Sequence, residues 1–207
     1  MIKNIIFDIG NVILGFDREK ILPEFVDNIE EQEFIEENII NSPEWLGYGL
    51  LDNGYLTIEE IISQIQDRTN HKNDHLVEKF LKSFPLYLDL YPDVIDIVKR
   101  LKDKGYNIYL LSNMCKYEHE SIKDSELFNY VDGYVLSYQE HQIKPYEGIY
   151  NTILNRYNLK ANESIFIDDN EKNIETANRL GIIGLKVEPD SYDSIIEVLK
   201  EKGITID

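Results

Sequence analysis

Polar residues with reactive side chains follow short apolar runs at separate places in the sequence. The set contains three carboxylates, a hydroxyl, an amide and an ammonium: Asp8, Ser112, Asn113, Lys144, Asp168 and Asp169. An ionised aspartate can attack phosphorus and form an aspartyl-phosphate intermediate. Hydroxyl and ammonium groups can balance the negative charge of phosphoryl oxygens. Brought together in one crevice, these side chains would suit phosphoryl transfer.

The carboxylates of this set imply a cation if they lie close together. Crowded anionic groups repel one another and repel an anionic substrate, and a hard divalent cation relieves that repulsion. Mg²⁺ favours carboxylate, carbonyl and water oxygens and bridges to phosphate. Each signal is weak alone, because Ser-Asn is common in turns and Asp-Asp-Asn can cap a helix. Their shared place after apolar runs is what predicts a magnesium-dependent site.

Patterns typical of strands and patterns typical of helices follow one another along the stretches of sequence that separate these reactive residues. Runs rich in β-branched and aromatic residues predict strands at 5–7, 106–113, 132–138, 163–169 and 181–187. Helical periodicity fills the gaps at 94–101, about 146–157 and about 171–180, and Pro145 suits the first turn of the second helix. This series predicts an α/β fold with a parallel, Rossmann-like sheet covered by helices on both faces. Ligands of such sheets bind beyond the carboxyl ends of the strands, where the reactive residues are found.

Residues 16–85 break this alternation. They contain acidic, helix-favouring segments and no convincing strand. Thr57 followed by Glu60 fits a capping box, in which each side chain binds the backbone of the other residue at the start of a helix. We therefore expect a helical cap domain at 16–85, inserted into a core domain formed by 1–15 and 86–207.

The composition indicates a packed globular protein with an acidic surface. Of the 207 residues 43% are hydrophobic, and the formal net charge at pH 7 is −18. This excess of negative charge repels phosphate backbones, so no nucleic-acid partner is expected. No membrane segment is expected, because no run approaches about 18 apolar residues, and a strand follows Met1 too closely for a signal peptide. A single cysteine, Cys115, excludes an intrachain disulfide, and we expect a cytoplasmic protein.

Four segments of the sequence together resemble the motifs of one family. "FDIGNV", "LLSN", "KP" and "IFIDDNEKNIETANRLGI" are similar to the first to fourth motifs of the haloacid dehalogenase-like (HAD) hydrolases. The likeness covers essentially the whole chain and is to subfamily IA, whose helical cap follows the first strand. The segment "WLGYGLLDNGYLTIEEI" also resembles cap helices of phosphatases in this subgroup. The resemblance implies a hydrolase that acts on a small phosphorylated metabolite with Mg²⁺.

The resemblance also implies a role for each reactive residue. Asp8 would be the nucleophile and a metal ligand, and the backbone carbonyl of Gly10 would be a second ligand. Asp169 would be the third ligand, with Asp168 helping directly or through water. The phosphate would be held by Ser112, Asn113 and Lys144.

One departure from the family pattern lies at Gly10, where phosphatases of the family usually carry a second aspartate. That aspartate acts as general acid and base, a role that contributes about 10²- to 10⁴-fold to the rate. Three interpretations stay open. The first is a phosphatase for easily expelled leaving groups, as in hexose 1-phosphates and other sugar phosphates. The others are a 2-haloacid dehalogenase, which needs no metal, and a phosphometabolite-binding module with weakened catalysis.

The cap and its entry contain further candidates. Asp17 is a candidate replacement for the missing acid, against the simpler interpretation of a solvated linker carboxylate. Trp45, Tyr48 and Tyr55 are candidates to face the active site, although large aromatic side chains more often serve as packing. Gly15 is a candidate hinge. The sequence leaves a monomer and a homodimer equally open.

Overall fold

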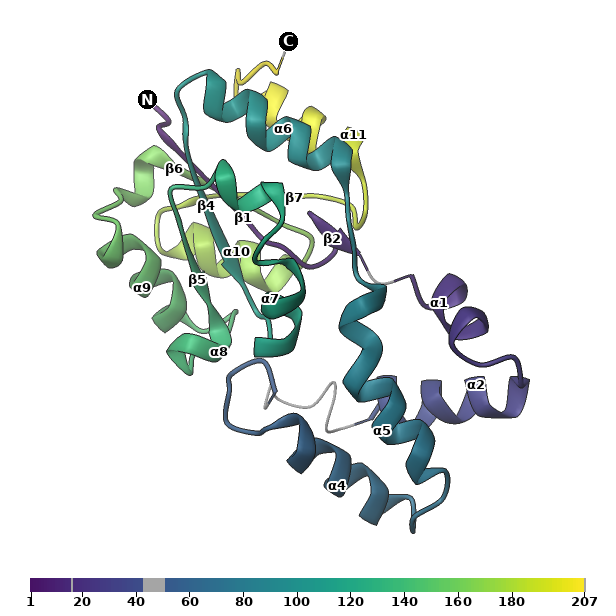
Figure 1. Cartoon of the computed structure of the whole chain (residues 1–207). Helices are drawn as coiled ribbons and strands as arrows, with labels where there is room; N and C mark the ends of the chain where they lie inside the picture. The colour runs from purple at the N-terminus through teal and green to yellow at the C-terminus, as the bar shows by residue number, and fades with distance from the viewer. Residues whose placement is uncertain (16, 43–50, 207) are drawn as a thin grey trace.

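A five-stranded parallel sheet forms the centre of the protein (Figure 1). The computed structural model describes residues 1–15, 17–42 and 51–206. The strands lie in the order β5-β4-β1-β6-β7, and their bounds are β1 (Asn4–Phe7), β4 (Asn107–Ser112), β5 (Gly133–Leu136), β6 (Ser164–Asp168) and β7 (Ile183–Lys186). Every neighbouring pair in this sheet is parallel, which confirms the α/β fold predicted from the sequence.

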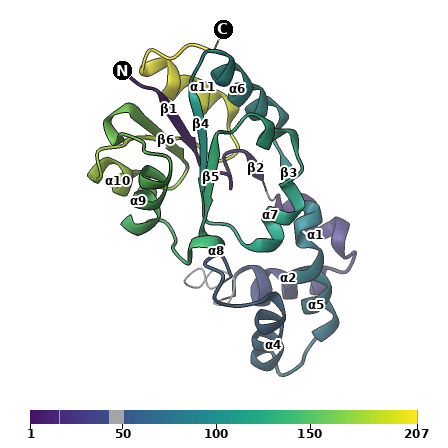
Figure 2. The same ribbon diagram turned by 60° about the vertical axis from the view of Figure 1, so that its left-hand side comes forward.

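Side chains of the sheet alternate between two apolar layers. Ile5 and Phe7 belong to one layer and Ile6 to the other, because successive residues of a strand face opposite sides of the sheet. Helices cover both layers (Figure 2): α6 (Pro92–Asp103) and α11 (Tyr192–Glu201) the first, and α9 (Glu147–Arg156) and α10 (Glu171–Arg179) the second. β1 lies at the middle of the sheet, so Asp8 stands at the middle of its carboxyl edge.

The chain after β5 differs from the sequence prediction. The strand predicted at 132–138 ends at Leu136, because Ser137 already begins a short helix, α8 (Ser137–Glu140). Elements that the sequence patterns did not predict are α11, α7 (Lys116–Ile122) and the short 3₁₀ turns η3 (Glu126–Asn129) and η4 (Ala161–Glu163).

Pro145 also lies outside the helix in which it was predicted. The following helix, α9, begins at Glu147. The side chain of Asn113 binds both the backbone N–H and the backbone carbonyl of Lys144. These two bonds compete with helical pairing and keep the Lys144-Pro145 segment in a loop.

The insertion consists of helices whose apolar side chains form a cluster that is separate from the two layers of the sheet and also includes Cys115 of the core. Their bounds are α1 (Arg18–Phe25), α2 (Ile29–Ile35), the π-helical turn η1 (Glu36–Ile40), α4 (Ile58–Arg68), α5 (Asp74–Ser83) and the 3₁₀ turn η2 (Phe84–Tyr87). The predicted capping box at the start of α4 is present, with both Thr57–Glu60 hydrogen bonds formed. Within the described ranges, none of the helices combines the length and apolar character that a bilayer crossing requires. We keep the term cap for residues 16–85, the division that we propose from the sequence.

Two short strands mark the passage between core and cap. β2 (Leu14–Gly15) and β3 (Asp89–Leu90) pair antiparallel, one before the cap and one after it (Figure 2). Gly15 lies against Tyr91, and a Cβ at position 15 would come within 1.6 Å of the Tyr91 hydroxyl oxygen. A side chain at position 15 would therefore have to displace the Tyr91 ring.

Candidate active site

Lys144 lies between two buried carboxylates at the carboxyl edge of the sheet. Its Nζ is 2.7 Å from Asp8 Oδ2 and 2.7 Å from Asp168 Oδ2. Asp8 follows β1 and Asp168 ends β6, and these two strands are neighbours in the sheet. Each of the three residues is less than a tenth exposed. The strand ends thus bring together residues that are far apart in the sequence.

Asp169 completes a group of three carboxylates. One oxygen from each of Asp8, Asp168 and Asp169 lies within 4.8 Å of the others. Asn11 orients Asp169 by donating a hydrogen bond from Nδ2 to Oδ2 at 3.2 Å. A set of carboxylate oxygens this close together fits a divalent cation such as Mg²⁺.

Asp168 is the most constrained carboxylate of the three. Its Oδ1 accepts a hydrogen bond from the backbone N–H of Asn170 at 2.8 Å, and its Oδ2 accepts one from Lys144 at 2.7 Å. Both of its oxygens also accept from Asn173 Nδ2 at 3.0 Å. A carboxylate has about four lone-pair sites, so those of Asp168 are occupied. Asp8 and Asp169 have more capacity to bind a cation directly.

The electrostatics of this centre favour an added positive charge. Burial raises the pKa of Asp8 to about 7, with Lys144 opposing the rise and Asp168 adding to it. Burial also raises the pKa of Asp169. For Lys144 burial disfavours the ammonium, but the charges of Asp8 and Asp168 outweigh it, and the pKa is raised. One ammonium therefore shares a buried site with more negative charge than it can balance, which a cation would relieve.

The end of β4 contributes a hydroxyl and an amide. Ser112 is buried, and its Oγ donates to the backbone carbonyl of Asn113 at 3.3 Å. Asn113 Nδ2 donates to the Lys144 carbonyl at 3.0 Å, and Asn113 Oδ1 accepts from the Lys144 N–H at 2.7 Å. The amide that the resemblance assigns to phosphate binding is thus engaged with the backbone of Lys144, where it fixes the residue that carries the ammonium.

Position 10 has room for a side chain. A Cβ built on Gly10 meets no atom within 4 Å among the described residues. The backbone N–H of Asn11 donates to the carbonyl of Leu14 at 2.7 Å and closes the loop that follows. Position 10 is therefore open, where phosphatases of the resembled family carry a second aspartate.

Asp52, an acidic residue of the cap, lies near Lys144 and was not predicted from the sequence. Burial raises the pKa of Asp52 to about 6, and the Lys144 ammonium partly offsets this rise. Glu118 of α7 lies near Asp52. Burial raises the pKa of Glu118 to about 8, and the charge of Asp52 adds to that rise. The only sequence signal was slight, namely that Asp52 directly precedes an Asn-Gly turn.

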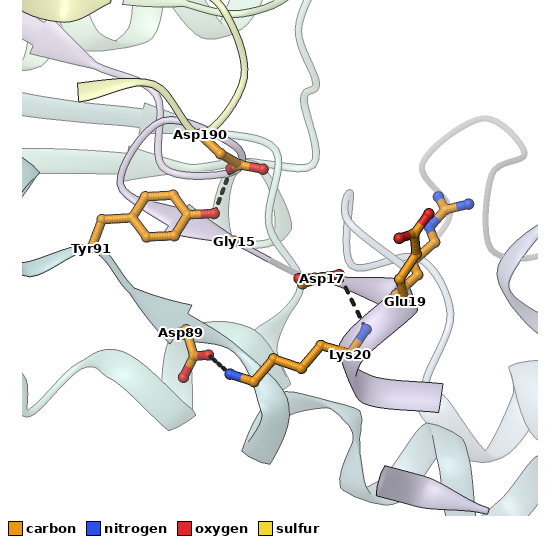
Figure 3. Close-up of a pocket in the computed structure, with 8 residues that line it drawn as sticks. Gly15, Asp17, Glu19, Lys20, Asp89, Tyr91 and Asp190 are labelled. Carbon is orange, nitrogen blue, oxygen red and sulfur yellow. Dashed lines mark hydrogen bonds and ion pairs between the residues drawn. The ribbon is translucent and has the colours of Figure 1, made fainter. Parts of the chain in front are cut away.

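Asp17, the predicted candidate for the missing acid, has a structural role at another place. It is exposed and is the N-cap of α1, where its carboxylate accepts from the backbone N–H of Lys20 at 3.2 Å. It also lines a hollow of about 510 Å³ beside the β2–β3 ribbon, with Asp89 and Asp190 (Figure 3). Tyr91 donates to Asp190 at 2.5 Å in the lining of this hollow.

The aromatic candidates of the cap divide into two groups. Tyr55 stacks on His141 of the core, with ring centroids 5.4 Å apart, and is 62% exposed. It therefore packs the cap against the core, which is the more common role of large aromatic side chains. Trp45 and Tyr48 lie outside the described residues.

Comparisons with known proteins agree with this geometry. The model of the haloacid dehalogenase-like hydrolases matches residues 2–181. A D-ribitol-5-phosphate phosphatase of Bacteroides thetaiotaomicron is 28% identical over 200 residues, which cover 87% of this chain and 89% of that protein.

Two solved structures show the same fold. A HAD family enzyme of Bacteroides thetaiotaomicron, crystallised with magnesium and inorganic phosphate, has a TM-score of 0.72 at 24% identity, over 92% of this chain and 96% of that one. A HAD-like family hydrolase of Porphyromonas gingivalis has a TM-score of 0.75 at 24% identity, over 98% of both chains. The resemblance inferred from the four motifs is confirmed: the chain belongs to the haloacid dehalogenase-like hydrolases.

Proposed function

We propose that the protein is a Mg²⁺-dependent phosphatase that hydrolyses a small phosphomonoester, such as a sugar phosphate, through an aspartyl-phosphate on Asp8. The observation that carries this proposal is the buried centre in which Lys144 bridges Asp8 and Asp168, with Asp169 beside them. This centre offers a nucleophile, a cationic partner for phosphoryl oxygens and carboxylates for a divalent cation.

The chemistry divides among the residues of the centre. Asp8 attacks phosphorus with a carboxylate oxygen, and the ester oxygen leaves with the bonding electron pair. Water then attacks the aspartyl-phosphate, which regenerates Asp8 and releases inorganic phosphate. The Lys144 ammonium and the Ser112 hydroxyl stabilise the phosphoryl oxygens, while Asn113 positions Lys144 through its backbone.

Asp8, the backbone carbonyl of Gly10 and Asp169 would hold Mg²⁺. Asp168 would add negative charge beside the ion and hold Lys144 in place, because its oxygens already accept hydrogen bonds. The bound ion supplies positive charge that offsets the phosphoryl group and the crowded carboxylates. The structural neighbour crystallised with magnesium and inorganic phosphate supports this choice of cation.

A phosphorylated sugar or polyol is the substrate class that one relative supports. The relative named D-ribitol-5-phosphate phosphatase acts on a polyol monophosphate and aligns with most of this chain. The two alternatives raised by Gly10 are less well supported. A 2-haloacid dehalogenase needs no metal, yet three carboxylates crowd at this site. A phosphometabolite-binding module would have the same buried centre but would not turn over its ligand.

The test is a phosphate-release screen over small phosphomonoesters with Mg²⁺. Three proteins are compared: wild type, Asp8→Asn, and the control Asp67→Asn, which makes the same chemical change on an aspartate of α4 whose side chain is 72% exposed. We expect release by wild type and by the control, loss of release in EDTA, and no release by Asp8→Asn.

Failure of wild type to release phosphate from any member of the panel would overturn the proposal. Halide release from 2-chloropropionate in EDTA would favour the dehalogenase instead. Accumulation of an aspartyl-phosphate without turnover would favour the binding module.

A further inference from the structure

A loop of the cap is fastened to the core beside the candidate active site. The Ser137 hydroxyl donates to the backbone carbonyl of Asp52, and His141 Nδ1 lies 2.8 Å from the carbonyl of Asn53. Gly54, at φ +72°, lies so close to Tyr138 that a Cβ would come within 2.5 Å of its carbonyl oxygen. The loop before α4 therefore docks on α8 and the residue that follows it (Figures 1 and 2).

This docking is continuous with the residues of the active centre. The hydroxyl of Ser137 that holds Asp52 also accepts from the backbone N–H of Met114 at 2.9 Å. Met114 directly follows Asn113, whose side chain fixes the backbone of Lys144. One hydrogen-bonded path thus runs from the loop after β4 to the cap, and it sets Asp52 near the ammonium that bridges Asp8 and Asp168.

The surroundings of Asp52 suit a carboxyl group that exchanges a proton. The Lys144 ammonium acts electrostatically on Asp52, and the charge of Asp52 in turn raises the pKa of the Glu118 carboxyl and of the Cys115 thiol. Burial raises the pKa of Asp52 to about 6, so a substantial fraction is protonated just below neutrality. Glu118 is less free, because its Oε2 accepts the backbone N–H of Cys115 at 2.8 Å and caps α7.

We propose that Asp52 is the general acid and base of the reaction, brought by the cap to replace the carboxyl group that Gly10 lacks. This inference rests on the proposed phosphatase function. It accounts for the open space at position 10, for the docking of the cap loop, and for a further, partly buried carboxyl group near Lys144 in addition to Asp8 and Asp168.

In this proposal one proton passes from Asp52 to the leaving group and is replaced from water. When Asp8 attacks phosphorus, the P–O ester bond breaks, and the leaving alkoxide takes the proton of the Asp52 carboxylic acid to become an alcohol. Asp52 is then a carboxylate. In the second step it accepts a proton from the water that attacks the aspartyl-phosphate, and so returns to its acid form as inorganic phosphate is released.

The experiment compares leaving groups in the full-length protein with Mg²⁺. p-Nitrophenyl phosphate expels a stable phenolate and needs little protonation, whereas D-ribitol 5-phosphate, or another alkyl phosphate found in the screen, expels an alkoxide. We expect Asp52→Asn to lose about 10²- to 10⁴-fold in kcat/KM on the alkyl phosphate and less than about threefold on p-nitrophenyl phosphate. Asp67→Asn should match wild type on both. Equal losses on the two substrates, or no loss, would overturn the inference.

A second measurement needs no variant and covers the case in which Asp52→Asn does not fold. Above a pH of about 6 Asp52 is increasingly ionised and cannot donate a proton. In wild type, the ratio of kcat/KM for p-nitrophenyl phosphate to that for the alkyl phosphate should therefore rise through this pH. Titration of Asp8 affects both substrates and cancels in the ratio. A ratio that stays constant with pH would overturn the inference, whereas absence of activity on both substrates would overturn the proposed function itself.

Discussion

The core centre and the cap loop present carboxylates to the same ammonium in different ways. Asp8 and Asp168 stand at the ends of neighbouring buried strands, and each contacts Lys144 at 2.7 Å. Asp52 reaches the neighbourhood of Lys144 from a loop that is held to the core by hydrogen bonds such as Ser137 to Asp52, across 85 residues of sequence. The groups that we propose to act at phosphorus thus lie at the carboxyl edge of the sheet, and the group that we assign to the leaving oxygen lies on the cap.

The largest effect on stability should come from the core side of this comparison. Lys144→Ala leaves Asp8 and Asp168 buried without their common counter-charge. Removing one partner of a buried ion pair costs about 3–5 kcal/mol, so we expect the free energy of unfolding to fall by about that amount in EDTA. Mg²⁺ should restore part of it, because the ion supplies positive charge to the same carboxylates. Urea unfolding with and without Mg²⁺ measures both effects.

A loss below about 1 kcal/mol in Lys144→Ala would contradict the view that the core centre depends on direct charge pairing. Lys82→Ala is the matched control. Its ammonium pairs with Glu78 on the exposed surface of α5, where both side chains are about half exposed. A surface pair of this kind contributes about 0–1 kcal/mol.

A smaller effect is expected at the junction of the two regions. Ser137→Ala removes the hydroxyl that joins the Met114 N–H to the Asp52 carbonyl. Leaving buried polar groups unpaired costs about 1–3 kcal/mol, which thermal or urea unfolding would detect. Because Asp52 loses its anchor, turnover of alkyl phosphates should fall more than turnover of p-nitrophenyl phosphate.

Ser125→Ala provides the control for this change. The Ser125 hydroxyl is buried and has no hydrogen-bond partner within the described part of the chain. Its removal should leave both stability and the ratio of the two activities close to wild type. An equal loss of both activities in Ser137→Ala would show that the anchor supports the fold and not the acid.

The smallest effect on stability should come from a substitution within the cap, away from its contact with the core. Thr57→Ala breaks the capping box at the start of α4, in which Thr57 Oγ1 accepts from the Glu60 N–H at 3.2 Å. Loss of an N-cap costs about 1 kcal/mol, and we expect the midpoint of urea unfolding to fall accordingly with kcat unchanged. A fall in kcat would mean that α4 is coupled to the active centre, although it lies in the cap and the centre lies in the core.

The core centre could be predicted from sequence, but the cap contact could not. Asp8 and Asp168 stand at the ends of apolar runs, and parallel strands bring their carboxyl ends to one edge, so pattern and topology together bring them close. Lys144 lies further on, in the loop after β5 and α8, and its place was expected only from the order of the predicted strands. Asp52 follows no such rule. Its place depends on the packing of two irregular loops, which have no periodicity that a sequence pattern could reveal.

A prediction made from local sequence alone was also wrong where a side chain from another part of the chain binds the backbone. Pro145 suits the first turn of a helix by its own geometry. The Asn113 amide nevertheless holds the backbone of Lys144 in a loop, so the helix begins later, at Glu147. A side chain from another strand end overrides the local preference, and the sequence around Pro145 contains no sign of it.

The most direct test of the central claim is to trap the covalent intermediate. The protein is mixed with Mg²⁺ and a substrate from the screen, quenched in acid during turnover and treated with borohydride, which reduces an aspartyl-phosphate to homoserine. Mass spectrometry of the peptide containing Asp8 should then find homoserine at position 8, only when substrate was present. Release of phosphate with no change at position 8, or with the modification on another residue, would contradict the claim that Asp8 is the nucleophile.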